Sequence, residues 1–183
     1  MTAAFSSVKS AILSIFLAGV FLSASLRGAD EKKMTVVDYF LLLPKDTLEA
    51  PPRAWLDNHA QVVDKQNGYI CITGDGAQPS FQVALFRYRD GRALLALCSG
   101  ELEGDDLVTL EFFELGTDGK MHKAPRNVFP IGDRWSSGEY DSKYEDLQFE
   151  LPRRGRTILV RSLRSRKILR KFTWNSEKFV EEK

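Results

Sequence analysis

The sequence predicts a mainly β fold: an antiparallel meander of about eight strands, closed as a barrel or folded into a sandwich, with one or two short N-terminal helices. Apolar and polar residues alternate with period two along much of the chain from Gln61 onward. Asn-Gly and Asp-Gly pairs, which favour tight hairpin turns, separate the alternating segments. Consecutive strands joined by short turns pair most simply with their neighbours. Twelve phenylalanines and 43% apolar residues are sufficient for a sizeable core.

The N-terminal residues have the order of a secretory signal peptide. Lys9 supplies a positive charge, and residues 11–26 form an apolar segment without a charged residue. The small residues Ser23, Ala24 and Ser25 lie near its end. This segment is shorter than the roughly 20 residues that cross a bilayer comfortably. We therefore expect a signal peptide at residues 1–29 and a single exported β-rich domain at residues 30–183. The domain would be periplasmic or extracellular, without stable membrane insertion after cleavage. An uncleaved N-terminal anchor is the alternative.

Two short helices are expected before the first strand. Thr35-Val36-Val37-Asp38 has the form of a capping box, and the apolar residues 39–43 continue it until Pro44 stops the helix. So dense an apolar segment indicates burial in the core. Pro51-Pro52 can begin a second helical turn through residues 53–58, because proline is tolerated in the first turn.

Eight segments are expected as strands, and residues 120–123 and 179–180 are candidates for additional edge strands. The eight segments are 61–64, 69–73, 81–89, 92–99, 107–115, 147–151, 157–163 and 168–174. Residues 124–145 contain prolines, glycines and serines, and they are expected to form a long ordered loop.

The hairpin around Asp90-Gly91 is predicted to lie in the middle of the sheet. A two-residue turn there places Phe86 opposite Leu95 and Val83 opposite Cys98. Both faces of the hairpin are then largely apolar, which indicates that both are covered.

The chain has two cysteines, Cys71 and Cys98, and an exported chain favours a disulfide. If Cys71 pairs with Val83, the two cysteines lie two strands apart, roughly 10 Å at about 4.8 Å per strand. A disulfide needs Cα atoms within roughly 7 Å. The geometry therefore favours two free, buried cysteines.

Charges are segregated along the sequence. Seven acids and no base lie between Gly100 and Asp118, whereas nine bases and no acid lie between Arg153 and Lys171. The simplest interpretation is that these hairpins are neighbours or that the charges are solvated. However, a tight hairpin register would place Arg161 opposite Arg170, and facing like charges require compensation by an acid of the protein, an anionic ligand or an acidic partner. The candidate binding residues of this hairpin are Arg161, Arg164, Arg166 and Arg170.

The segment from Trp135 to Tyr140 is a second candidate binding element, because exposed loops rich in tryptophan and tyrosine often bind partners. Alternatively, Trp135 and Tyr140 fold back over one end of the barrel. The string Ser137-Gly138-Glu139-Tyr140 resembles the Ser-Gly-x-x-Tyr loop of periplasmic lysozyme inhibitors, although it is one residue shorter.

No catalytic residue, metal site or cofactor is predicted. His59 and His122 have no partner at metal-ligand spacing, and nucleophile-elbow and phosphate-loop motifs are missing from the sequence. The acids of residues 101–106 do not match the calcium-loop template. A formal net charge of +1 argues against a general nucleic-acid binder, which is normally strongly basic.

A broader resemblance covers most of the expected mature domain. The strings that carry it are Asp38-Tyr39-Phe40-Leu41-Leu42-Leu43-Pro44, Asn67-Gly68-Tyr69-Ile70, Ala84-Leu85-Phe86-Arg87 with Asp90-Gly91, and Phe112-Phe113-Glu114-Leu115. In this order they resemble a group of small exported bacterial proteins of uncharacterised function. The resemblance implies export and a β-rich fold, and it implies no activity.

We therefore expect an exported, non-catalytic binding domain of the cell envelope or extracellular space, with a protein or an anionic ligand as its partner. One alternative is a carrier with a barrel cavity for a small apolar ligand, in which inward positions such as Phe86, Leu95 and Leu97 leave a void. Another is an inhibitor of a cell-wall hydrolase such as lysozyme.

Overall fold

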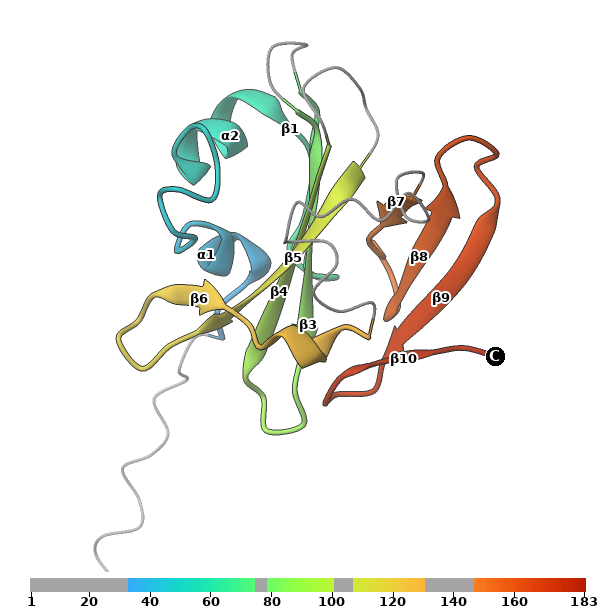
Figure 1. Cartoon of the computed structure of the whole chain (residues 1–183). Helices are drawn as coiled ribbons and strands as arrows, with labels where there is room; N and C mark the ends of the chain where they lie inside the picture. The colour runs from blue at the N-terminus through green and yellow to red at the C-terminus, as the bar shows by residue number, and fades with distance from the viewer. Residues whose placement is uncertain (1–32, 75–78, 101–106, 131–146) are drawn as a thin grey trace, which may run out of the picture. The chain divides into compact units, whose positions relative to one another are not determined.

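The computed structural model describes residues 33–74, 79–100, 107–130 and 147–183, and Met34–Lys183 forms one compact unit. The expected signal peptide and the segment containing Trp135 and Tyr140 lie outside the described residues. Within them the fold is mainly β, with two short α-helices, a 3-10 turn and ten strands (Figure 1). The elements are α1 (Val36–Phe40), α2 (Pro52–His59), β1 (Ala60–Asp64), β2 (Tyr69–Ile72), β3 (Phe81–Arg87), β4 (Ala93–Gly100), β5 (Leu107–Leu115), β6 (Met121–Lys123), η1 (Arg126–Val128), β7 (Leu147–Glu150), β8 (Thr157–Ser162), β9 (Ile168–Trp174) and β10 (Phe179–Glu181).

The strands form two antiparallel sheets. β1 to β6 follow one another in a six-stranded sheet, and β7 to β10 form a four-stranded sheet in the order β10-β9-β8-β7. The predicted meander is confirmed, but the strand number is ten in the described ranges rather than about eight, because β6 and β10 both pair with their neighbours. The barrel alternative is wrong for this part of the chain: β1 and β6 do not pair, and neither do β7 and β10.

The two helices cover one face of the six-stranded sheet (Figure 1). The Thr35 N–H donates to the Asp38 carboxylate (2.7 Å), as the capping box predicts. Pro52 occupies the first turn of α2, also as predicted. The side chains of Phe40 and Trp55 are buried against apolar residues of β2 to β5, so the helices and this face share one core.

The four-stranded sheet covers the opposite face. The shared core is largely aromatic: the Phe129 ring lies 4.8 Å from Phe172, 5.3 Å from Phe179 and 5.5 Å from Phe112 between ring centroids. Polar contacts also join the sheets, among them two hydrogen bonds. The Trp174 indole N–H donates to the Arg87 carbonyl (2.8 Å), and the Leu151 N–H donates to the Gln82 side-chain oxygen (2.9 Å). The β3–β4 hairpin is therefore central and covered on both faces, as predicted.

The register of this hairpin differs by one residue from the predicted one. Phe86 lies opposite Leu94 rather than Leu95, and Val83 lies opposite Leu97 rather than Cys98. The Tyr88 N–H donates to the Arg92 carbonyl (2.9 Å), which leaves a three-residue loop with Gly91 at φ 89°. A type I′ turn would require a positive φ at Asp90, and Asp90 is not among the described residues with positive φ. Because both faces are apolar, the sequence pattern does not penalise this shift.

The inward positions fill the core. Phe86 is buried between the two sheets, whereas Leu95 and Leu97 are buried under the helices, and each is at most 4% exposed. The void that a carrier of apolar ligands would need at these positions is occupied by side chains.

Two buried tryptophans provide a matched test of the bond between the sheets. Trp55 and Trp174 are each 2% exposed, but only Trp174 donates its indole N–H; Trp55 Nε1 has no partner in the described part of the chain. Trp174→Phe should therefore destabilise the protein by about 1–3 kcal/mol more than Trp55→Phe, because it leaves the Arg87 carbonyl without its donor. Urea unfolding of the two variants measures the difference, and equal losses would show that the hydrogen bond contributes nothing net.

Candidate functional site

The basic hairpin β8–β9 does not have the predicted register. Arg161 lies opposite Ile168, and Arg170 lies opposite Val160, so the two arginines do not face each other. The turn causes the difference. The Ser162 N–H donates to the Lys167 carbonyl (3.0 Å), Arg166 has φ 59°, and a bulge then shifts the pairing between Val160 and Arg161.

The candidate arginines of this hairpin have partners within the protein. Arg161 Nε lies 2.7 Å from a Glu150 carboxylate oxygen on β7, and Arg170 Nε lies 3.6 Å from a Glu181 oxygen on β10. Arg166 Nη1 donates to the Gln148 side-chain oxygen (2.8 Å), and Arg164 also has a partner. The predicted facing pair is therefore wrong, and Arg161 and Arg170 each pair with an acid of a neighbouring strand instead.

The described acids of the predicted acidic segment pair within their own sheet. Glu111 pairs with Lys123, and Glu114 accepts from the Tyr88 hydroxyl. Asp118 lies 3.0 Å from His122 Nε2. These acids therefore do not neutralise the basic hairpin, and the remaining acids at residues 101–106 lie outside the described ranges.

One part of the hairpin remains exposed on both faces. Residues 168–171 are all exposed although they belong to strand β9, in which successive side chains point to opposite faces. Ile168 and Leu169 are 42% and 54% exposed, and basic residues flank this pair on both sides. Lys167 and Lys171 are exposed and have no ion-pair partner among the described residues. We call residues 167–171 the β9 segment.

The β9 segment was missed in the sequence because the strand was expected to alternate. The sequence Lys167-Ile168-Leu169-Arg170-Lys171 carries a usable sign: two adjacent large aliphatic residues between bases break the period of two. Such a break is compatible with a bulge, and the structure places an irregularity in pairing here.

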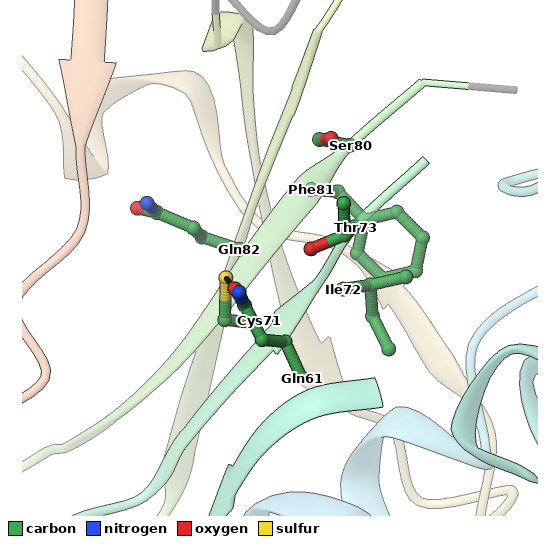
Figure 2. Close-up of a pocket in the computed structure, with 7 residues that line it drawn as sticks. All are labelled: Gln61, Cys71, Ile72, Thr73, Ser80, Phe81 and Gln82. Atoms are coloured by element: carbon green, nitrogen blue, oxygen red, sulfur yellow. Dashed lines mark hydrogen bonds between the residues drawn. The ribbon is translucent and has the colours of Figure 1, made fainter. Parts of the chain in front are cut away.

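A pocket of about 230 Å³ lies at β1 to β3, near the β1 edge of the six-stranded sheet (Figure 2). Its lining residues are Gln61, Cys71, Ile72, Thr73, Ser80, Phe81 and Gln82. Figure 2 shows the Gln61 side chain turned toward Cys71, whose Sγ lies 3.7 Å from the Gln61 oxygen. Six of these seven side chains have no charged form at neutral pH. Burial raises the pKa of the seventh, the Cys71 thiol, so it is neutral as well.

Both cysteines are free thiols. Gln82 lies between them in the sheet, opposite Cys71 on one side and opposite Cys98 on the other, so the cysteines are two strands apart as predicted. Cys98 is buried, whereas Cys71 is half-buried, which corrects the prediction for Cys71. Burial raises the pKa of both thiols, and a protonated thiol is a poor nucleophile.

The two histidines lie in separate parts of the described structure. The His59 ring lies 5.3 Å from the Trp55 ring at the end of α2, and His122 and Asp118 form an exposed pair in the β5–β6 turn. Across the described ranges, no three or more His, Cys, Asp or Glu side chains gather in a way that could hold a metal ion. The helices described here are too short to cross a membrane.

Comparisons with known proteins give no functional information. No protein-family model matches the chain, and no curated protein matches it. A solved structure described as a domain of an uncharacterized protein from Porphyromonas gingivalis W83 is similar, with 15% sequence identity and a TM-score of 0.47. The similarity covers 80% of this chain and 97% of that chain. A similarity at this level carries no argument about function, and the resemblance to exported bacterial proteins stays a prediction.

Arg153, the first base of the basic segment, joins the two sheets through Asp64. Arg153 Nε lies 3.1 Å from Asp64, and hydrogen bonds from Asn67 together with this contact lower the pKa of Asp64 to about 2. A lowered carboxyl pKa stabilises the folded state above the unfolded pKa, near 3.8, and this contribution is lost as the pH falls toward 2. Asp64→Asn should therefore destabilise the protein at pH 6 and flatten the loss of stability between pH 4 and 2.

Urea unfolding at pH 6, 4 and 2.5 measures this dependence. Asp57→Asn, at an exposed position on α2, is the control, and it should leave the pH dependence as in the unchanged protein. An Asp64→Asn variant that keeps the full acid dependence would contradict the assignment.

Proposed function

We propose that this chain is an exported, non-catalytic binding domain of the cell envelope or extracellular space, and that the β9 segment contacts an acidic protein surface. The observation that supports the proposal is the exposure of Ile168 and Leu169 on β9, between two lysines that have no ion-pair partner in the described part of the chain. Large exposed apolar side chains bordered by polar groups are typical of contact surfaces.

The chemistry of the β9 segment indicates the kind of partner. Burying a fully exposed aliphatic side chain is favourable by about 1.5–3 kcal/mol. Ile168 and Leu169 are 42% and 54% exposed, so part of this binding energy is left unused by folding. Lys167 and Lys171 pair with no acid of the described ranges and can attract acidic groups, which accelerates association. Ile168 and Lys171 lie on the hydrogen-bonded strand β9, Leu169 is the extra residue of its bulge, and Lys167 comes just before the strand. An acidic surface with an apolar patch would match this arrangement.

The other candidate residues have a smaller part in this proposal. Arg161 and Arg170 hold the hairpin to β7 and β10, so we assign them a positioning role. Arg164 and Arg166 border the β9 segment, at the turn. Trp135 and Tyr140 lie outside the described residues, as does the string that resembles lysozyme inhibitors. The carrier alternative finds no support in the filled core.

Site-specific photocrosslinking in the organism that makes the protein tests the proposal. A photoreactive phenylalanine derivative at position 169 should give a discrete crosslinked protein. The same group at position 42 is the control, because Leu42 is 37% exposed but belongs to the α1 region. Replacing Lys167 and Lys171 with glutamine should reduce the crosslink several-fold, and raising the salt concentration should do the same.

The matched charge control is Lys45→Gln with Lys65→Gln, two exposed lysines far from β9 in the sequence. Equal crosslinking from positions 169 and 42, or a crosslink at position 169 that both lysine pairs weaken equally, would contradict the proposed contact surface. Unfolding of the Lys167 and Lys171 variant is checked by circular dichroism.

A further inference from the structure

The β7–β8 turn, residues 152–156, is held in place by both sheets. Arg153 Nε lies 3.1 Å from a carboxylate oxygen of Asp64, the last residue of β1. On the other side, the Trp174 N–H of β9 donates to the Arg156 carbonyl (2.9 Å). The backbone of the turn is therefore fixed by the fold, and a ligand bound there would not have to order it first.

The side chains of this turn concentrate positive charge. Arg153, Arg154 and Arg156 are all exposed and lie within four consecutive residues. Asp64 neutralises Arg153, because the pKa of this carboxyl is lowered to about 2 and the group is charged near neutral pH. The Glu150 carboxylate at the end of β7 already pairs with β8 (2.7 Å). The two remaining arginines have no ion-pair partner in the described ranges, so they repel each other, and an anion bound to both would offset this repulsion.

The backbone of the turn adds hydrogen-bond donors. The N–H groups of Arg154, Gly155 and Arg156 have no acceptor in the part of the chain that the structure describes. Gly155 has φ 87°, in the left-handed region that favours glycine, and there is open space where a Cβ would stand. Successive N–H groups in a turn of this kind form concavities that bind anions. Three backbone donors and two guanidinium groups thus come from three consecutive residues.

The chemistry of these groups favours a phosphate. A guanidinium presents parallel N–H donors that match two oxygens of a carboxylate or a phosphate. A phosphate monoester carries a charge of about −1.5 to −2 at pH 7, so one such group can balance two arginines, whereas a carboxylate balances one. We propose that Arg154, Arg156 and the N–H groups of residues 154–156 bind the phosphate of a phosphate monoester.

This site is independent of the β9 segment. The β7–β8 turn leads into the end of β8 at which Thr157 lies opposite Thr173, whereas Arg161 and Ile168 lie opposite each other near the far end of the same ladder. The two groups of free cations therefore lie at opposite ends of the β8–β9 hairpin, and each can be changed without the other.

NMR titration of the ¹⁵N-labelled protein at constant ionic strength tests the proposal. Glucose 6-phosphate is the probe, and glucose 6-sulfate and glucuronate are matched sugars with a single negative charge. We expect saturable shifts of the backbone N–H signals of residues 154–156 with glucose 6-phosphate, and binding at least fivefold weaker for the other two sugars. Sedimentation with vesicles of equal parts phosphatidylcholine and phosphatidic acid distinguishes the source of the phosphate. Pelleting identifies a lipid headgroup, and a protein that stays in solution identifies a soluble ester.

Arg154→Gln with Arg156→Gln should weaken the binding of glucose 6-phosphate at least tenfold. Urea unfolding should find this double variant at least as stable as the unchanged protein, because the change removes two like charges and no side-chain contact of the described ranges. The matched control is Lys167→Gln with Lys171→Gln, which removes the same charge from the other end of the hairpin and should keep the affinity. Equal weakening by the two double variants, equal affinity for the phosphate and the sulfate, or shifts that spare residues 154–156 would overturn the proposal.

Discussion

The burial of the six-stranded sheet on both faces is the constraint on which the rest of this structure depends. Residues 93–98 of β4 are buried without interruption, so neither face of the central hairpin can be left to solvent. The short helices α1 and α2 cover one face, and the four-stranded sheet covers the other. The bond from the Trp174 indole to the Arg87 carbonyl fixes the second sheet against the first, while the aromatic side chains around Phe129 fill the space between them.

Both candidate sites lie where this two-sided burial ends. In β9, Phe172 and Trp174 are buried against the first sheet, but residues 168–171, the other half of the strand, are exposed. At the other site, β1 is the outermost strand of the six-stranded sheet, and Gln61, the extra residue of its bulge, lines the pocket. The core thus determines which residues are free for contacts. The exposed strand half is open and basic, whereas the pocket is small and its described lining residues are uncharged.

The local elements could be predicted from the sequence because their causes are local. The capping box at Thr35 and the apolar character of β3 and β4 are readable in a few consecutive residues. The β3–β4 register could not be predicted, because Asp90-Gly91 is compatible with two loop lengths and a two-sided apolar strand tolerates either. The partners of Arg161 and Arg170 were also out of reach: Glu150 and Glu181 come from strands on either side of the hairpin, and only the sheet order brings them together.

Hydrogen exchange followed by mass spectrometry tests most directly whether the two sheets share one core. If they do, the backbone amides of β3, β4 and β8 should exchange at one common slow rate, because only global unfolding exposes them. Amides of the exposed β9 segment should exchange faster than those of residues 172–174 in the same strand. If β8 exchanged much faster than β3 and β4, the second sheet would open by itself, and the account of a single core covering both faces would be wrong.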